Sequence, residues 1–326
     1  MKNALAASMP KAMGARAINL NTLALPCFVC AGMEGRRNSS QTKAVAATGT
    51  MQKNAPRQPI ICPRKLPSGA ATTVAPAIWS EAKAQARNET LLLVTESPPN
   101  SMDIHGVGTN RPAYEVSWNT HDRLITYGVK KDANGNDHYD YTKLEPELAT
   151  DWNVTPTSAT FKLRKDAKFH DGTPFTADDV LFTFARAAGE GSDMKSYVND
   201  VKEVRKVNSH TVDVETKGPF PILPDVLSLL YIMSKKWCED NQATRPVDRR
   251  KGIENAASFR ANGTGPFRLR ERQPNVKTTF QRNGSYWGKI EGNVINVEYT
   301  PIGNDATRVA ALLSGQVDVI EPVPLQ

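Results

Sequence analysis

The pattern of apolar and polar positions changes near residue 89. Residues 1–88 show no sustained period of 2 or 3.6 residues and are rich in Ala, Pro, Ser, Thr, Lys and Arg. Such a segment buries too little apolar surface to offset the entropy lost on ordering, so we expect it to be disordered. We therefore divide the chain into a leader, residues 1–88, and one folded region, residues 89–326.

Strand patterns dominate the folded region. Residues 90–95 form a short apolar run that predicts a buried strand. Apolar residues alternate in 160–164, which places Phe161 and Leu163 on one face of a half-buried strand. The polar run 132–137 predicts a turn between two extended segments. Further strands are expected at 210–216, 265–269, 277–281, 294–300 and 317–320.

Three helices are expected among these strands. Thr176 and Asp179 have the spacing of a capping box, so a helix should begin at Thr176. Apolar residues then recur at spacings of four and three, which gives this helix one buried face, formed by Val180, Phe184 and Ala187. The other helices are expected at 114–127 and at 305–313, the latter capped by Asn304 and ended by Gly315. Strands and helices without a regular alternation favour an α/β or mixed α+β domain.

Charge divides the chain at the same place. Residues 1–88 contain 12 Lys or Arg and two acidic residues, whereas the remainder contains 29 basic and 32 acidic residues. The net charge of +7 therefore comes from the leader. A nucleic-acid-binding protein needs its positive charge clustered on the folded surface, so this class of partner is disfavoured. No stretch of the chain approaches the 18 to 20 apolar residues that span a bilayer.

The sequence of the leader is compatible with several explanations. Residues 20–33 are its most apolar part, but Asn21, Thr22 and Pro26 interrupt the run that a secretory signal requires. Its few acidic residues also fit an organelle transit peptide, and a wrongly assigned start codon is a third explanation. The Cys27–Cys30 spacing could be half of a zinc site or a redox pair, but no second pair or nearby histidine completes one.

The folded region offers little catalytic chemistry. It holds one cysteine, Cys238, and therefore no internal disulfide. His170 and Asp171 have no nucleophile or second base at a diagnostic spacing, and the following Gly172 favours a structural turn. Residues 263–266 (GTGP) lack the Lys-Ser/Thr of a phosphate-binding loop, so we expect their glycines to allow a tight turn before a strand. No catalytic residue, metal site or cofactor is expected.

Six segments, in order, resemble family 5 of the extracellular solute-binding proteins, which includes dipeptide, oligopeptide and nickel binders. The most specific is 169–180 (FHDGTPFTADDV), which leads to Arg186. In the segment 103–105 (DIH), Ile104 departs from the usual proline. The remaining four are 144–152 (LEPELATDW), 263–267 (GTGPF), 282–287 (RNGSYW) and 305–319 (DATRVAALLSGQVDV).

The resemblance implies a type II periplasmic-binding-protein-like clamshell of two mixed α/β lobes that close around a solute. Residues 89–326 would be its first lobe, truncated before the second, and a fragment is the simplest explanation. The implied function is capture of peptides or related small solutes in the periplasm and delivery to the permease subunits of an ABC importer. The aspartate that pairs with a peptide's amino terminus would lie in the missing part. A nonfunctional remnant and a peptide hydrolase are the alternatives, and the five histidines lack the spacing that a hydrolase needs.

The resemblance also implies ligand contacts. Gly108, Thr109 and Asn110 occupy the position of the family's ligand strand, whose backbone can pair with an extended peptide. Tyr197 follows Arg186 at roughly the distance of a ligand-facing tyrosine in oligopeptide binders. The alternative for these residues is an ordinary loop and local packing. Trp152 and Trp287 are expected in the core.

Overall fold

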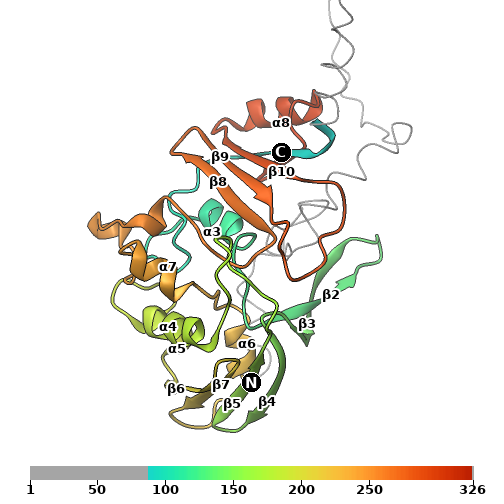
Figure 1. Cartoon of the computed structure of the whole chain (residues 1–326). Helices are drawn as coiled ribbons and strands as arrows, with labels where there is room; N and C mark the ends of the chain where they lie inside the picture. Colours follow the sequence, from blue (N-terminus) through green and yellow to red (C-terminus); the bar gives the residue numbers. More distant parts are fainter. Residues whose placement is uncertain (1–86, 325–326) are drawn as a thin grey trace, which may run out of the picture.

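The computed structural model describes residues 87–324 of the chain. The leader prediction and the cysteines Cys27, Cys30 and Cys62 therefore lie outside the described residues. Two sheets form the two ends of the molecule, and a hairpin projects at one side (Figure 1). Within residues 87–324, no helix has the length and apolar character needed to cross a bilayer.

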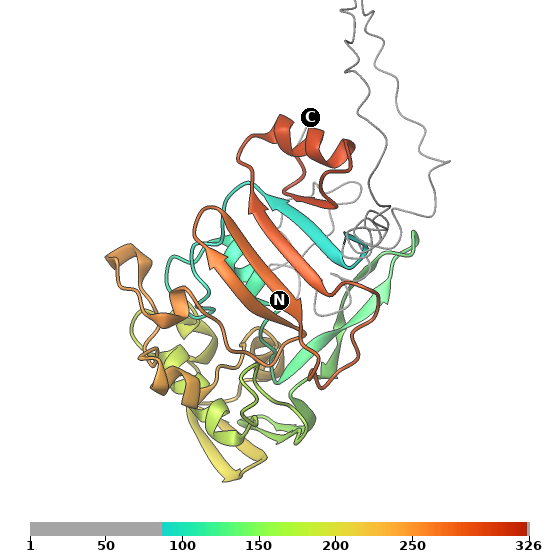
Figure 2. The same cartoon turned by 45° about the horizontal axis from the view of Figure 1, so that its top comes forward.

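One end of the molecule is a five-stranded mixed sheet with the order β11-β1-β10-β9-β8. Strand β1, next to the edge strand β11, pairs in parallel with both β10 and β11, and helix α8 connects those two along the chain. Figure 2 shows α8 above the edge of this sheet. The elements are β1 (Thr90–Thr95), β8 (Phe267–Gln273), β9 (Lys277–Arg282), β10 (Asn296–Pro301), α8 (Asp305–Leu313) and β11 (Val319–Glu321).

A compact apolar cluster fills the space between this sheet and helix α3 (Arg111–Ser117). Val116 of α3 belongs to it, together with Leu93 of β1 and Tyr299 of β10, which are register partners. Because the buried residues of β1, β9 and β10 alternate along each strand, one face of the sheet carries the cluster.

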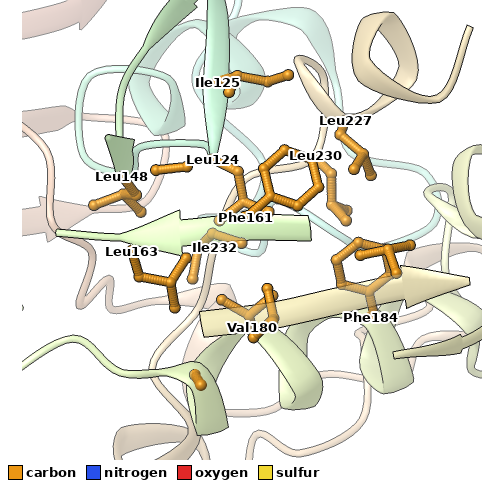
Figure 3. Packing of buried hydrophobic residues seen from close by; sticks show 14 of the residues in the cluster. Leu124, Ile125, Leu148, Phe161, Leu163, Val180, Phe184, Leu227, Leu230 and Ile232 are labelled. Atoms are coloured by element: carbon orange, nitrogen blue, oxygen red, sulfur yellow. The ribbon is translucent and has the colours of Figure 1, made fainter. Parts of the chain in front are cut away.

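The other end is a four-stranded antiparallel sheet with the order β4-β5-β7-β6. Phe161 of β5 lies opposite Trp152 and Val212 and is fully buried. Figure 3 shows Phe161 within the largest apolar cluster, to which helix α4 contributes Val180 and Phe184. The elements are β4 (Ala149–Thr155), β5 (Ser158–Leu163), α4 (Ala177–Ala188), β6 (Val201–Asn208) and β7 (Thr211–Thr216).

Hairpin β2–β3 forms a separate two-stranded sheet. Strand β2 spans Ile125–Lys131 and β3 spans Asp137–Pro146. The turn between them is stabilised by Asp132, whose carboxylate accepts hydrogen bonds from two backbone amides of the turn. Gly135 adopts φ of 80°, a conformation that favours glycine.

Short helices and loops join the two ends. Some of their apolar side chains form a third, smaller cluster that includes Ile104, Tyr231, Met233 and the buried Cys238. These elements are α5 (Lys195–Val198), α6 (Leu223–Leu227), α7 (Lys235–Asp240) and the 3₁₀ helices Arg249–Lys251 and Ala256–Ser258.

Most predicted elements are confirmed, but the helix expected at 114–127 is wrong. The helix begins three residues earlier, because the Asn110 side chain accepts a hydrogen bond from the Ala113 amide and Pro112 occupies the first turn. It ends at Ser117, and Tyr127 lies in β2. The mixed α/β fold class is confirmed, and Trp152 and Trp287 pack against the largest core cluster as expected.

The glycines of 263–266 are explained by a close backbone approach and not by a tight turn. A Cβ atom on Gly263 would lie 1.9 Å from the Thr120 carbonyl oxygen, and one on Gly265 would lie 2.6 Å from the Thr120 carbonyl carbon. Neither glycine has a positive φ. Residues 119–121 therefore run against this segment in a space where only glycine fits.

Candidate functional site

The site is built around a buried ion pair between Asp103 and Arg186. Arg186 donates to both carboxylate oxygens of Asp103, at 2.8 and 2.6 Å, and both side chains are fully buried. Burial alone would raise the pKa of Asp103, but the guanidinium of Arg186 outweighs it and holds this pKa below its ordinary value. The pair joins the loop after β1 to helix α4.

Asp103 also organises the backbone around it. Its carboxylate accepts hydrogen bonds from the amides of His105 and Val247, both at 3.0 Å. Arg186 donates further to the carbonyls of Ala243 and Arg245, each at 3.1 Å. Since every charge-bearing group has a partner, the pair can hold three chain segments in fixed positions.

The chain that leaves this pair, residues 106–110, is held from two sides. The amide of Val107 donates to the carbonyls of Gly191, at 3.2 Å, and Val247, at 2.9 Å. The carbonyl of Val107 accepts from the amide of Arg249 at 3.0 Å. A Cβ on Gly106 would lie 2.3 Å from Cγ2 of Val247, which shows how closely these segments pack.

Asn100 and Asn110 fix the far end of the segment. Each asparagine carbonyl oxygen accepts from the other residue's backbone amide at 3.0 Å, which forms a reciprocal pair. The Asn110 side chain also caps α3 by accepting from the Ala113 amide at 3.2 Å. The Asn100 side-chain amide donates to the carbonyl of Gly108 at 2.9 Å.

Of the three residues predicted as the ligand strand, Thr109 has a free backbone. The Gly108 amide donates to Asp193 and its carbonyl accepts from Asn100, while the Asn110 amide and carbonyl are used by Asn100 and the first turn of α3. Within residues 87–324, neither the amide nor the carbonyl of Thr109 has a hydrogen-bond partner, and Thr109 is partly exposed. The Thr109 hydroxyl donates to the Gly106 carbonyl at 2.8 Å, so the side chain is held aside.

Gly108 meets a conformational requirement of the segment. Its φ is 77°, in the left-handed region, and a Cβ there would contact Cγ of Arg250 at 3.4 Å and Cβ of Arg249 at 3.5 Å. A larger residue would be strained at this φ whatever the space around it. This glycine therefore sets the direction in which the Thr109 peptide groups point.

Tyr197 is brought near this segment through Tyr114. Burial raises the pKa of Tyr114 to about 12, and the neighbouring Asp193 carboxylate and Tyr197 phenol add to the rise. The Tyr114 hydroxyl lies 3.5 Å from Oδ2 of Asp193, which also accepts from the Gly108 amide at 3.2 Å. Tyr197 itself is partly buried and packs against the largest core cluster.

Two residues at this site were missed by sequence reasoning: Tyr114 and Asp193. Tyr114 was expected only as the start of a helix, and no role was predicted for Asp193. No signal in a single sequence connects Asp193 with Gly108, 85 residues away. Asp193 precedes Tyr197 by four residues, but a polar residue at this spacing from an aromatic one is too common in sequences to indicate a site.

His170, the one residue considered for catalysis, has a structural environment. Its Nε2 lies 2.9 Å from the Gly265 carbonyl, and its ring is largely buried. Burial lowers the pKa of His170 to about 4. The following Gly172, with φ of 90°, completes the predicted turn. Within the described part of the chain, no group of three or more His, Cys, Asp or Glu side chains could hold a metal ion.

Comparison with known proteins gives consistent matches. Residues 143–326 match the family described as bacterial extracellular solute-binding proteins, family 5 Middle. The probable peptide-binding protein YejA of Agrobacterium fabrum is 30% identical over 159 residues, which are 46% of this chain and 25% of that protein. The probable D,D-dipeptide-binding periplasmic protein DdpA of Escherichia coli is 26% identical over 252 residues, which are 75% of this chain and 45% of that protein.

A solved structure has the same fold. The binding protein AgaA in complex with agropinic acid, from A. tumefaciens R10, is 26% identical and superposes with a TM-score of 0.59. The superposition covers 72% of this chain and 44% of AgaA. The chain thus spans less than half the length of each of these three proteins.

Proposed function

Because the chain belongs to family 5 of the bacterial extracellular solute-binding proteins, we propose that it captures peptides or related small solutes and delivers them to the permease of an ABC importer. The names of YejA and DdpA support peptides as the solute, and the AgaA complex supports related small molecules as the wider class. The word periplasmic in the name of DdpA supports the periplasm as the compartment.

The proposal includes a domain assignment. Residues 89–326 act as the first lobe of a type II clamshell, and residues 1–88 stand outside that lobe. The coverage of less than half of AgaA is consistent with one lobe. Solute then lies against the segment 106–110, which is partly exposed at residues 107–110.

The observation that carries the proposal is the free backbone of Thr109. A fixed, partly exposed segment with an unused amide and carbonyl can accept an extended peptide by adding it as a strand. Backbone pairing is insensitive to the side chains of the peptide, so one site can serve many sequences. In this arrangement Gly108 and Asn110 position the segment, Thr109 pairs with the solute, and Tyr197 contributes an aromatic wall.

Thermal unfolding of the full chain with and without a pooled di- to pentapeptide library tests the proposal. A ligand that binds the folded state alone stabilises it by about 2.7 kcal/mol at a hundredfold excess over Kd. For a domain of this size the melting temperature should rise by roughly 5–10 °C. A cooperative transition that no library member shifts would contradict the proposal.

A matched ligand tests the role of backbone pairing. The same peptides, methylated on their internal amide nitrogens, keep their side chains but cannot donate to a neighbouring strand. We expect them to give a much smaller rise in melting temperature than the unmodified peptides. Equal shifts from both sets would show that the solute does not bind by strand addition at Thr109.

A further inference from the structure

Asp193 is placed against the segment 106–110 by three contacts. Its backbone amide donates to the His105 carbonyl at 3.0 Å. Its Oδ2 atom accepts from the Gly108 amide at 3.2 Å and lies 3.5 Å from the Tyr114 hydroxyl. The carboxylate therefore lies one residue away from the free peptide groups of Thr109.

Asp193 differs from the other carboxylates around this segment in having no cation. Asp103 is paired with Arg186, Asp248 lies 3.7 Å from Lys251, and Glu254 is paired with Arg249. Within residues 87–324, no Lys, Arg or His nitrogen lies within 4 Å of the Asp193 carboxylate oxygens. Its Oδ1 atom also has no hydrogen-bond partner in that part of the chain. A partly exposed carboxylate with a free oxygen can accept a hydrogen bond from an added cation.

A phenol ring lies beside this carboxylate, and a second phenol lies near the first. Tyr114 lies beside it, and Tyr197 is close enough to Tyr114 to affect its ionisation. Aromatic faces attract ammonium and guanidinium groups, and partial desolvation strengthens that attraction. A carboxylate with an aromatic neighbour is thus a suitable environment for a cation and an unfavourable one for an anion.

We propose that Asp193 is a specificity-determining residue that selects solutes carrying an ammonium or guanidinium group beside Thr109. This inference rests on the proposed function, because it takes the segment 106–110 as the solute-facing one. The cation comes either from a basic side chain or from the amino terminus of a peptide. In both cases the group donates to the free oxygen of Asp193 while the peptide backbone pairs with Thr109.

The test is isothermal titration of the full chain with tripeptides of alanine in which one position is lysine or its uncharged analogue norleucine. A second pair compares trialanine with a free and an acetylated amino terminus. If Asp193 binds a side chain, one lysine position should bind about tenfold more tightly than norleucine, a difference of 1.4 kcal/mol. If it binds the amino terminus, acetylation should cause a loss of similar size.

The diagnostic variant is Asp193→Asn. Asparagine keeps an oxygen that can accept from the Gly108 amide, so the segment should stay in place while the charge is lost. In this variant the ratio of the affinities for the cationic and the uncharged ligand should fall close to one. Asp193→Glu should retain part of the preference. Asp240→Asn is the matched control, because it removes one carboxylate on α7, where Asp240 pairs with Lys236 at the surface. This control should keep the preference.

The outcomes separate the two proposals. Binding without a preference for cationic ligands, or an equal preference in wild type and Asp193→Asn, overturns this inference and leaves the proposed function intact. A lower melting temperature of Asp193→Asn with unchanged preference shows that Asp193 only tethers the segment, and also overturns it. The protein could instead prefer a glutamate-containing tripeptide and lose that preference in Arg250→Ala. That result would assign selection to the other side of Gly108 and would overturn this inference. Failure of every tripeptide to bind overturns this inference, whereas the proposed function is decided separately by the thermal shift with the di- to pentapeptide library.

Discussion

At the scale of single residues, Gly263 has the most restricted environment of the described glycines. Its Cα faces the Thr120 carbonyl so closely that a side chain cannot enter, and the ring of His121 lies beside the same position. This contact holds the segment before β8 against the segment that follows α3. The two segments lie about 140 residues apart in the sequence.

We predict that Gly263→Ala destabilises the fold strongly. The added methyl would lie 1.9 Å from the Thr120 oxygen, so backbone must move, and overpacking of this kind costs about 3 kcal/mol or more. Urea denaturation of the full chain measures the change in unfolding free energy. Gly284→Ala is the control, since no atom lies within 4 Å of its added Cβ and its effect should stay below about 1 kcal/mol. Equal effects at both positions would contradict the close approach.

The Asp103–Arg186 pair gives a second prediction for single residues. Asp103→Asn should lower the free energy of unfolding by about 3–5 kcal/mol, because it leaves a fully buried guanidinium without a counter-charge. The exposed pair Lys236–Asp240 offers the comparison, and Lys236→Ala should cost less than about 1 kcal/mol. Chemical denaturation at pH 7 measures both. A loss below 1 kcal/mol for Asp103→Asn would show that Arg186 finds other partners.

At the scale of elements, helix α3 is short and depends strongly on the residue that caps its N-terminus. Seven residues are too few for a stable helix without support. Asn110 supplies the cap and also joins the Pro98–Asn100 loop through its side chain. The start of α3 and the position of the segment 106–110 are therefore set by the same side chain.

We predict that Asn110→Ala costs more than loss of an ordinary cap. A capping residue contributes about 1 kcal/mol, and the bonds to Pro98 and Asn100 should raise the loss to about 2–3 kcal/mol. Asn304→Ala is the matched variant, because Asn304 caps α8 at an exposed position. Urea denaturation of both variants gives the comparison. The prediction fails if Asn304→Ala is the more damaging of the two.

The same elements show what a single sequence can predict. Strand β1 follows from its short apolar run, whereas the start of α4 at Thr176 and the whole of α8 follow from apolar periodicity and a recognisable cap. Strands β4 and β6 were missed because their residues are mostly exposed or charged and carry no alternation. The end of α3 was missed because residues 118–124 contain no Gly or Pro that would mark the end of a helix.

The candidate site shows the limit of such prediction. The motif segments located Asp103 and Arg186, but only the fold shows that the two form one buried pair, 83 residues apart. Gly108, Thr109 and Asn110 were proposed as equivalent, whereas their hydrogen bonds divide them into one free residue and two supports. Contacts between loops leave no periodic trace in the sequence, so their partners could not be inferred.

At the scale of the whole molecule, an acidic cluster ties α3 to the parallel strands. Glu115 of α3 and Glu321 of β11 are both buried and share the half-exposed Arg111. The Tyr299 hydroxyl of β10 donates to Glu115 at 3.3 Å. Burial raises the pKa of Glu115 to about 7 against the opposing effect of Arg111, and nearby Glu321 adds to the rise.

Because the pKa of Glu115 is raised, the direction in which its contribution to the unfolding free energy changes with pH can be stated. Between about pH 4.5 and pH 7 the folded chain binds the Glu115 proton more tightly than the unfolded chain, so this group's contribution to stability falls as pH rises. Glu115→Gln lacks that proton equilibrium. The difference in unfolding free energy between variant and wild type should shift by about 2 kcal/mol in favour of the variant from pH 5 to pH 8.

Urea denaturation of both proteins at pH 5, 6, 7 and 8 checks this shift. The buried histidines, whose pKa values are lowered, act in the opposite direction but equally in both proteins, so they cancel in the difference. Glu239→Gln, at an exposed position, is the control, and its unfolding free energy should change with pH as that of the wild type does. If the unfolding free energy of Glu115→Gln also changes with pH as that of the wild type does, the pKa of Glu115 is not raised and the prediction is wrong.

The position of β1 has a consequence for how the chain acquires this fold. β1 is an interior strand of its sheet, yet both of its neighbours come from sequence roughly 200 residues later. At ribosomal rates of about 5–20 residues per second, an apolar strand must wait about 10–40 seconds for its first partner. Pairing over such a separation is intrinsically slow. For a protein proposed to act beyond the cytoplasmic membrane, that delay leaves β1 unpaired, and its place in this sheet unfilled, while most of the chain is being synthesised.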